Sequence, residues 1–385
     1  MFELDCGQNF DPERGAEFLA ALPERPAVFL IEMRQAEARP YLARTANLRR
    51  RVTGLIARSE EPSRRLNLRE IAARIRYRLT GSPFEQALGV YQLARELFPQ
   101  RYRGWMRLRP PALLKVKLAS AYPRCYVTRR ILSDGASYFG PFSSRKAADA
   151  FHDQFLNFYK IRRCQIKILR DPAFPGCIYS EMKMCLAPCF AGCSDEEYRA
   201  EVGRVVEFLS TSGVSLTSAL ESERDAASTD LDFERGAALH KKLEKVAAVL
   251  RSLPELARQV DQLHAVVLQP AAEEKAVAVY AVHGGTIAEP FVLRFWELAA
   301  GPRSLEAILR QGLGEGATAP GETTAAGQWR ETLADHLSLL SRWYYSKPRV
   351  GEILFFDRGW PYRRIARACA RLLGETGGRT NSSGT

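Results

Sequence analysis

Long apolar stretches are missing from this 385-residue chain, and their absence argues against two classes of protein. No run approaches the ~18 consecutive apolar residues of a membrane-spanning helix, so we expect no membrane span. The first residues, MFELDCGQNFDPERG, lack the basic segment and apolar stretch of a secretory signal. We therefore expect a cytoplasmic protein whose thiols are reduced.

The composition also argues against wholesale disorder. Apolar residues make up 46% of the chain and charged residues 26%, as in ordinary folded proteins. At about 150 residues per domain, the length suggests two or three compact units. We find no internal repeat. These features predict a multidomain globular protein.

Positive charge is concentrated in one part of the chain. Lys and Arg number 56 against 44 Asp and Glu, which gives a net charge of +12. Residues 101–170 hold 16 basic residues against three acids (Asp134, Asp149 and Asp153), a net charge of +13. Such a segment attracts a polyanion, because binding to phosphates releases condensed counterions. We predict a nucleic-acid surface here, and the alternative is a solvated basic surface that only aids solubility.

The cysteines are clustered too. Five of the eight are Cys164, Cys177, Cys185, Cys189 and Cys193. Reduced clustered thiols usually bind metal, but the paired C-x2-C knuckles of zinc sites are missing. The irregular spacing, with Pro188 directly before Cys189, favours an iron–sulfur cluster, with zinc as the alternative. Without metal, these would be five small buried side chains. Cys193 lies one helical turn beyond Cys189 and is either a spare thiol or an alternative ligand.

Hydrophobic periodicity predicts mixed secondary structure. Helices are expected in DPERGAEFLAALP, TANLRRRVTGLIAR, 67–79, 83–97, SRKAADAFHDQFLNFY, 196–212, 217–251 (with a break at Asp230), 328–345 and YRRIARACARLL. Strands are expected in PAVFLIEM, RPYLAR, 113–142 (with a turn at Asp134-Gly135), 264–268, 276–282, 291–295 and VGEILFF. A flexible loop is expected over 299–327, and TGGRTNSSGT is expected to be disordered.

Several motifs occur in an order that we know from one family. PAVFLIEM and RPYLARTANLRRRV resemble a GIY-YIG nuclease domain, and LDFERGAALHKKLEKV resembles a UVR motif. The most specific block runs from YPRCYVTRRILSDGASYFGPFSSRKAA to GCIYSEMKMCLAPC, and AVAVYAVHGGTI follows the UVR motif. Together they resemble the UvrC/Cho family of excinuclease subunits over about residues 25–295. The family's C-terminal RNase H-like nuclease has no counterpart after VGEILFF.

This resemblance implies an α+β multidomain fold with five units. These are a degenerate GIY-YIG-like α/β domain (1–108), a basic cysteine-rich Fe–S domain (109–200), a helical UVR-like hairpin region (201–256), a β-rich segment (257–350, with loop 299–327) and a basic helix with a disordered tail (351–385). It also implies nucleotide excision repair, with DNA and a UvrB-like protein as partners and Phe233 and Glu234 contacting the latter. It implies a 4Fe–4S cluster on Cys164, Cys177, Cys185 and Cys189.

The residues at the family's catalytic positions match only in part. The matching residues are Tyr41, Arg44 (where lysine is usual), Asn47 and Arg51. The degenerate positions are Phe29 for the first tyrosine, Ala43 for a glycine and Tyr91, or Gln92 beside it, for the metal-binding glutamate. Without that carboxylate Mg²⁺ is hard to hold. We therefore predict a DNA-binding component with impaired or absent incision, and the alternative is an active Mg²⁺-dependent endonuclease that nicks damaged DNA with UvrB.

Basic side chains were also assigned to DNA contact from their position in these motifs. They are Arg49, Arg50, Lys115, Lys117, Arg129, Arg130, Arg145, Lys146, Arg162 and Arg163. A protein that neutralises phosphates in this way binds DNA without reading its sequence.

Overall fold

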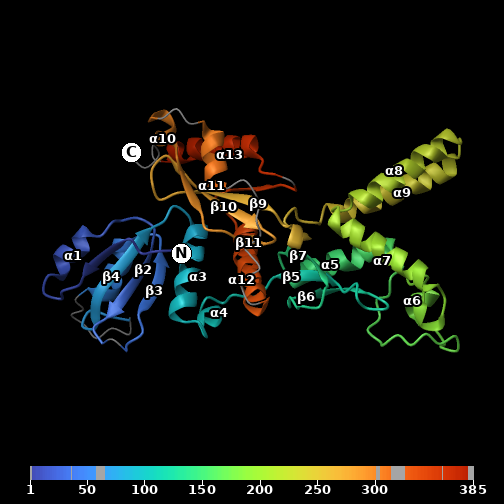
Figure 1. Cartoon of the computed structure of the whole chain (residues 1–385), viewed down its shortest axis with the longest axis horizontal. Helices are drawn as coiled ribbons and strands as arrows, with labels where there is room; N and C mark the ends of the chain where they lie inside the picture. Colours follow the sequence, from blue (N-terminus) through green and yellow to red (C-terminus); the bar gives the residue numbers. More distant parts are fainter. Residues whose placement is uncertain are drawn as a thin grey trace.

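The computed structural model describes residues 2–35, 37–57, 66–300, 304–313, 326–357 and 359–379. Within these ranges the chain forms separate antiparallel sheets covered by helices, which confirms the α+β class. Figure 1 shows the first sheet at one end of the molecule, a second toward the other end, and a third between and above them.

The first sheet has the strand order β1-β4-β2-β3. Its strands are β1 (Cys6–Asn9), β2 (Ala27–Met33), β3 (Tyr41–Thr45) and β4 (Ala72–Leu79). Helices α1 (Gly15–Ala21) and α2 (Leu48–Ile56) cover one face, and α3 (Pro83–Leu97) covers the other. Side chains alternate along β2, so Phe29 joins the core under α2 while Val28 and Leu30 join the core under α3.

The helix predicted over 67–79 is wrong, because residues 72–79 form strand β4. Its sequence, AARIRYRL, alternates apolar and basic residues with the period of a strand. Ile75 and Tyr77 are buried on one face, whereas the neighbouring arginines point away from it. Pairing with both β1 and β2 places this strand inside the sheet.

The second sheet has the order β6-β5-β7-β8. Its strands are β5 (Ala112–Val116), β6 (Cys125–Thr128), β7 (Ser137–Phe142) and β8 (Arg258–Gln259). The helices of this part are α4 (Tyr102–Trp105), α5 (Arg145–Phe155), α6 (Ile178–Glu181), α7 (Asp195–Ser210), α8 (Val214–Thr229) and α9 (Phe233–Leu250). Helices α8 and α9 form a long hairpin that projects from the body of the molecule (Figure 1).

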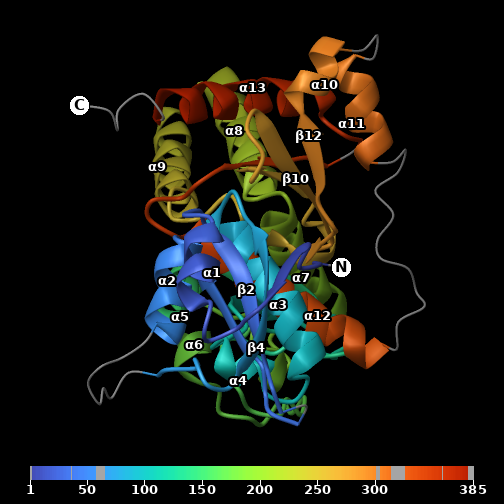
Figure 2. The same cartoon turned by 90° about the vertical axis from the view of Figure 1, so that its left-hand side faces the viewer.

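The third sheet joins the last part of the chain to the segment after the hairpin. Its strands are β9 (Ala265–Pro270), β10 (Ala276–His283), β11 (Thr286–Ile287), β12 (Phe291–Arg294) and β13 (Glu352–Phe355). The helices are α10 (Phe295–Ala300), α11 (Leu305–Leu313), α12 (Ala326–Tyr344) and α13 (Tyr362–Arg379). Figure 2 shows α13 lying along this sheet, and β13 pairs with β9, so residues on both sides of position 350 share one sheet.

Two expected irregular segments are partly helical. The flexible loop predicted over 299–327 is wrong for 305–313, because α11 buries Leu309 against α13 and β12. Residues 301–303 and 314–325 lie outside the described residues. The disordered end predicted over 376–385 is wrong for its first four residues, which extend α13, and 380–385 lie outside the described residues. Most other helices and strands predicted from periodicity are confirmed to within a few residues.

One hydrophobic core unites the first and third sheets. Residues of α3 and of the N-terminal segment pack with β9, β10 and α12. At the turn before α3 the two parts touch through backbone, since a Cβ on Gly81 would overlap the carbonyl oxygen of Pro270. Among the described residues, no helix has both the length and the apolar character needed to cross a membrane.

Candidate functional site

Tyr41 and Arg51 meet on the α2 face of the first sheet. Tyr41 lies at the start of β3, and Arg51 lies in the first half of α2. The Arg51 guanidinium donates a hydrogen bond to the Tyr41 hydroxyl at 2.8 Å. Phe29 lies beside them, with its ring 6.1 Å from the Tyr41 ring, and its side chain is fully buried. The strand–helix connection is short, so the sequence spacing alone brings this pair together.

Three further predicted residues lie between them in sequence. Asn47 is the N-cap of α2, and its side-chain oxygen accepts the Arg50 backbone N–H at 2.9 Å. Arg44 is exposed and donates to the Pro83 carbonyl at 3.4 Å, which is a weak contact. Ala43 packs against the core of the α2 face. Asn47 thus has a structural role that accounts for its position.

Tyr91 lies elsewhere, on the opposite side of the sheet. It is 1% exposed and points from α3 toward α12. There Asp335 accepts hydrogen bonds from the Tyr102 hydroxyl at 2.7 Å and from Arg103 at 3.0 Å, with the Tyr91 hydroxyl 3.5 Å away. Burial first, and then the Asp335 carboxylate, raise the pKa of Tyr91 to about 12.

We call this group of α3, α4 and α12 residues the α3–α12 junction: Tyr91, Arg95, Tyr102, Arg103, Asp335 and His336. The structure therefore does not bring position 91 to Tyr41 and Arg51. Sequence reasoning missed Asp335, because it lies 244 residues from Tyr91 and no local pattern marks it.

The four predicted cysteines lie near one another. Burial raises the pKa of the Cys185 thiol to about 11, and Cys164, Cys177 and Cys189 add to this rise through their charge. The Ala187 backbone N–H donates to the Cys185 sulfur at 3.3 Å. Burial raises the pKa of the Cys189 thiol, and backbone N–H donors of its own loop oppose this rise. Within the described ranges, no group of three or more His, Cys, Asp or Glu side chains is already arranged to hold a metal ion.

The loop around these thiols is tightly bent. Ala187 and Ala191 both adopt a left-handed conformation, with φ of 57° and 61°. The Gly192 N–H donates to the Ala187 carbonyl at 3.0 Å and closes the bend. This geometry turns backbone N–H groups toward the sulfurs, as iron–sulfur sites require to stabilise thiolates.

Cys193 has a different environment from the other four. It is 8% exposed and belongs to the core of the second sheet, with Tyr198 and Phe155. Burial is the largest cause of its raised pKa, and among the cysteines only Cys189 contributes, as the weakest cause. Cys193 is therefore placed as a core residue.

Several basic residues predicted to contact DNA are committed to the fold instead. Lys115 is 2% exposed, and its ammonium pairs with Asp134 at 2.6 Å and lies over the Tyr138 ring. The Lys115 charge is buried and neutralised in this pair, so its contact with DNA stays a prediction that this geometry does not favour. The carboxylate hydrogen bond raises the pKa of Lys115 against the opposing effect of burial.

Three of the predicted arginines are also held by their neighbours. Arg49 donates to the Leu22 carbonyl at 2.7 Å and to Glu24 at 2.5 Å. Arg162 donates to two backbone carbonyls, and Arg163 donates to Asn157 at 3.0 Å. Arg163 also lies close enough to Cys185 for the two side chains to interact electrostatically. These side chains are half-buried and bonded to neighbouring residues. They therefore hold the local fold together and are less available for a contact with phosphate.

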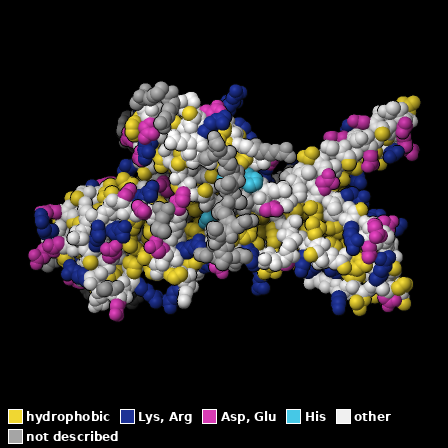
Figure 3. Space-filling view, viewed as in Figure 1, with side chains coloured by type: hydrophobic (Ala, Val, Ile, Leu, Met, Phe, Trp, Pro, Cys, Tyr) yellow, Lys and Arg dark blue, Asp and Glu magenta, His cyan; other side chains and the backbone are white. Residues whose placement is uncertain are grey.

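The remaining predicted residues lie at the surface. Lys117 is partly exposed, 4.0 Å from Asp134. Those that are exposed are Arg50, Arg129, Arg130, Arg145 and Lys146. In Figure 3 dark blue side chains are scattered over the visible face at both ends of the molecule. The structure therefore retains a basic surface, although a smaller one than the count of basic residues predicts.

Phe233 and Glu234 stand at the tip of the projecting hairpin. Phe233 is the first residue of α9 and is 75% exposed, next to Leu231 at 70%. Asp232 caps the helix by accepting the Arg235 backbone N–H at 3.0 Å. An exposed aromatic side chain at the end of a projecting element is typical of a protein contact.

Residues 112–208 match the model of the UvrC/Cho excinuclease middle domain. This range spans the first three strands of the second sheet (β5, β6 and β7), the cysteine loop and most of α7. Over these residues the chain is similar to UvrC/Cho excinucleases. The curated relatives include the UvrABC system protein C of Carboxydothermus hydrogenoformans, 31% identical over 59% of this chain and 38% of the relative.

More distant relatives match over more of the chain's length. The UvrABC system protein C of Methanothermobacter thermautotrophicus is 27% identical over 78% of this chain and 49% of the relative. That of Acetivibrio thermocellus is 23% identical over 88% of this chain and 55% of the relative. The chain thus spans about half the length of the curated relatives it matches. No solved structure matches it.

Proposed function

We propose that this chain is a DNA-binding component of nucleotide excision repair whose GIY-YIG-like site does not cut DNA. The observation that carries the proposal is the match of residues 112–208 to the UvrC/Cho middle domain, because this range holds the cysteine loop and four of the five exposed basic residues that we predict to contact DNA. Arg129, Arg130 and Lys146 supply charge for phosphate contacts there.

Among the described residues, no carboxylate contacts Tyr41 or Arg51 and could hold a catalytic metal there. Phosphodiester hydrolysis by this class of site uses a divalent cation to polarise the phosphate and activate water. Tyr41 and Arg51 offer a hydroxyl and a positive charge, but the position expected to offer a carboxylate is Tyr91, which is buried in the α3–α12 junction. The retained Tyr41–Arg51 contact is what favours the second candidate, a Mg²⁺-dependent nuclease.

The donor set of the cysteine loop fits an iron–sulfur cluster held by Cys164, Cys177, Cys185 and Cys189. Cys164 and Cys177 act through their charge on both Cys185 and Cys189, and backbone N–H groups already point at these two sulfurs. Bound there, the cluster would cross-link a loop that has little regular structure of its own. Zinc is the alternative metal, since four thiolates also suit it.

The hairpin supplies the proposed contact with a UvrB-like protein. Phe233 and Glu234 present an exposed ring and a carboxylate at the start of α9, beside the turn that joins it to α8. We expect Phe233→Ala to weaken this association at least tenfold, because buried aromatic anchors dominate such interfaces. DNA binding by the chain alone is expected to stay unchanged.

A nicking assay tests the proposal. The full chain is mixed with UvrB, Mg²⁺ and a duplex that carries one bulky lesion, and a relative known to cut serves as the positive control. We expect the chain to bind the duplex without nicking it, and Tyr41→Phe and Arg51→Ala to behave as the unchanged chain does. Nicking that either substitution abolishes would establish the nuclease instead.

A further inference from the structure

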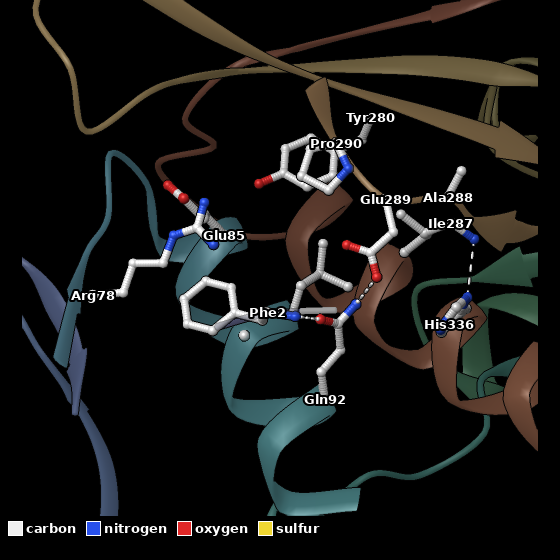
Figure 4. Close-up of a pocket in the computed structure, with 12 residues that line it drawn as sticks. Phe2, Arg78, Glu85, Gln92, Tyr280, Ile287, Ala288, Glu289, Pro290 and His336 are labelled. Carbon is white, nitrogen blue, oxygen red and sulfur yellow. Dashed lines mark hydrogen bonds between the residues drawn. The ribbon is translucent and has the colours of Figure 1, made fainter. Parts of the chain in front are cut away.

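A cavity of about 180 Å³ lies where the first and third sheets meet. Its walls come from the N-terminal segment, β4, α3, β10, α12 and the turn after β11 (Figure 4). Gly89 makes room for one wall, since a Cβ there would overlap the Phe2 ring. Residues 288–290 at its rim are exposed, so the cavity opens to solvent there.

Three polar side chains in this cavity have bonding capacity that the protein does not use. Tyr280 is 1% exposed, and its hydroxyl has no hydrogen-bond partner among the described residues. The Arg78 guanidinium lies 4.8 Å from the centre of the Phe2 ring. It donates no hydrogen bond to any described residue. Glu85 accepts the Gly81 N–H at 2.7 Å through one carboxylate oxygen and leaves the other unused by described residues. Figure 4 shows the three groups pointing toward one another.

Unpaired polar groups in a buried cavity reduce the stability of the fold unless a bound molecule forms hydrogen bonds with them. A buried hydroxyl without a partner destabilises a fold by about 1–3 kcal/mol. Burial raises the pKa of Tyr280, so the hydroxyl stays protonated and is able to donate or accept. The guanidinium of Arg78 needs acceptors, and the free oxygen of Glu85 needs a donor. Together they match a ligand that carries acceptors and donors on neighbouring edges.

The volume of the cavity and the charges of its side chains indicate which class of ligand it binds. Sites for drug-sized ligands usually occupy about 300–1,000 Å³, so this smaller cavity suits a single ring system. Arg78 and Glu85 carry opposite charges, which favours a neutral ligand over an ion. Guanine offers the paired acceptors O6 and N7 that arginine binds in bidentate fashion, whereas adenine offers N7 alone. Guanine also carries a ring N–H and an amino group, which are donors for a carboxylate.

We propose that this cavity binds a guanine base. Arg78 donates to O6 and N7, the free oxygen of Glu85 accepts from the ring N–H and the amino group, and Tyr280 completes the set with its hydroxyl. The base comes either from a free guanine nucleotide or from a nucleotide extruded from DNA, as enzymes that act on bases do. The proposal does not depend on incision, and its free-nucleotide form does not depend on DNA binding.

Calorimetry with GMP, AMP and CMP on the full chain provides the first test. We expect GMP to bind at least tenfold more tightly than AMP and CMP. Tyr280→Phe and Glu85→Gln keep the shape of the cavity and are expected to weaken GMP binding about tenfold each, the effect of one lost hydrogen bond in a buried site. Equal binding of the three nucleotides, or unchanged GMP affinity in both variants, would overturn the free-nucleotide form of the proposal.

A matched tyrosine separates binding from folding. The Tyr345 hydroxyl donates to the Pro141 carbonyl at 2.9 Å, outside the cavity. Tyr345→Phe is therefore expected to lower the melting temperature without changing GMP affinity. Tyr280→Phe is expected to change affinity without lowering the melting temperature, because its hydroxyl has no protein partner to lose.

Bulged duplexes distinguish the two sources of the base. If DNA supplies it, a duplex with one unpaired guanine binds more tightly than one with an unpaired adenine, and Tyr280→Phe removes this preference. If a free nucleotide supplies it, GMP binds while the two duplexes bind equally. A chain that prefers neither GMP nor the guanine bulge contains no guanine site.

Discussion

The α3–α12 junction and the cysteine loop both contain several polar side chains. Those of the junction are hydrogen-bonded to one another, whereas the thiols of the loop are not bonded to one another. In the junction Asp335, Tyr102 and Arg103 satisfy one another in a nearly buried network. In the loop Cys164, Cys177 and Cys185 lie half-exposed and free of disulfides. Polar groups that satisfy one another stabilise a fold, whereas polar groups left uncommitted are available to a ligand. Changes in the junction should therefore affect stability, and changes in the loop should affect what the protein binds.

The largest expected effect concerns the loop. We expect Cys185→Ser to abolish the visible absorbance of anaerobically purified protein, because it removes the most central of the four proposed ligands. Iron, zinc and sulfide analysis with absorbance spectroscopy measures this. Cys193→Ser is the matched control and should keep the colour, since Cys193 packs in the core. A colourless unchanged protein with stoichiometric zinc would contradict the cluster.

The next largest effect concerns the junction. Tyr91→Glu would place the family's expected residue at this position, but beside Asp335 rather than beside Tyr41. We expect it to lower the free energy of unfolding by about 3 kcal/mol or more, because it removes a buried aromatic ring and buries a second carboxylate next to Asp335. Urea unfolding measures the loss.

The same variant tests the separation of position 91 from the catalytic face. We expect no gain of Mg²⁺-dependent nicking. As a control, Glu331→Gln removes only the exposed partner of Arg103, 3.5 Å away, and should cost less than 1 kcal/mol. Restored nicking in Tyr91→Glu would show that the two regions are not separate.

A smaller effect is expected from pH. Burial first, and then Arg95, lower the pKa of His336 to about 4, and Glu289 opposes this shift. The Nδ1 atom of His336 accepts the Ile287 N–H at 2.9 Å, so the neutral ring is the form that the fold uses. An unfolded histidine titrates near pH 6.5. The unfolded state therefore takes up the proton first, and this stability is present above pH 6.5 and is lost as the pH falls toward 4.

Unfolding curves across this range measure the effect of His336. We expect His336→Gln to flatten the decline of unfolding free energy between pH 6.5 and 4. His240→Gln is the control, because His240 lies exposed on α9, 3.8 Å from Glu244. An equal change in the two variants would argue against a special role for the junction histidine.

The smallest expected effect compares two basic residues of the second sheet. Exposed Arg130→Ala should weaken DNA binding less than tenfold and reduce the salt slope by about one. Lys115→Met should leave affinity and slope unchanged while lowering stability, because it leaves Asp134 without its ion pair. Fluorescence anisotropy at several salt concentrations measures both. A salt slope that changes with Lys115 would show that its charge reaches the DNA.

Local spacing predicted much of the candidate site. Tyr41 and Arg51 lie on adjacent elements ten residues apart, and the strand–helix geometry fixes their contact. The four cysteines fall within one loop, so their proximity also follows from the sequence. The hairpin tip at Phe233 follows from the break at Asp230 between two periodic segments.

Long-range packing decided what local spacing did not. Strand β4 was mistaken for a helix because its alternation is short and its pairing partners lie far away in sequence. Burial of Lys115 depends on Asp134 across the turn, and no count of charges distinguishes a paired lysine from a free one.

The sequence by itself determined the α+β composition, the order of the motifs, the Tyr41–Arg51 pair and the grouping of the thiols, because each depends on residues close together in the chain. The tertiary structure alone decided that α3 turns Tyr91 toward Asp335, that Cys193 belongs to the core, and that Arg78, Glu85 and Tyr280 line one cavity. These outcomes depend on how distant sheets pack, and that packing is set by the sum of many apolar contacts rather than by any one motif.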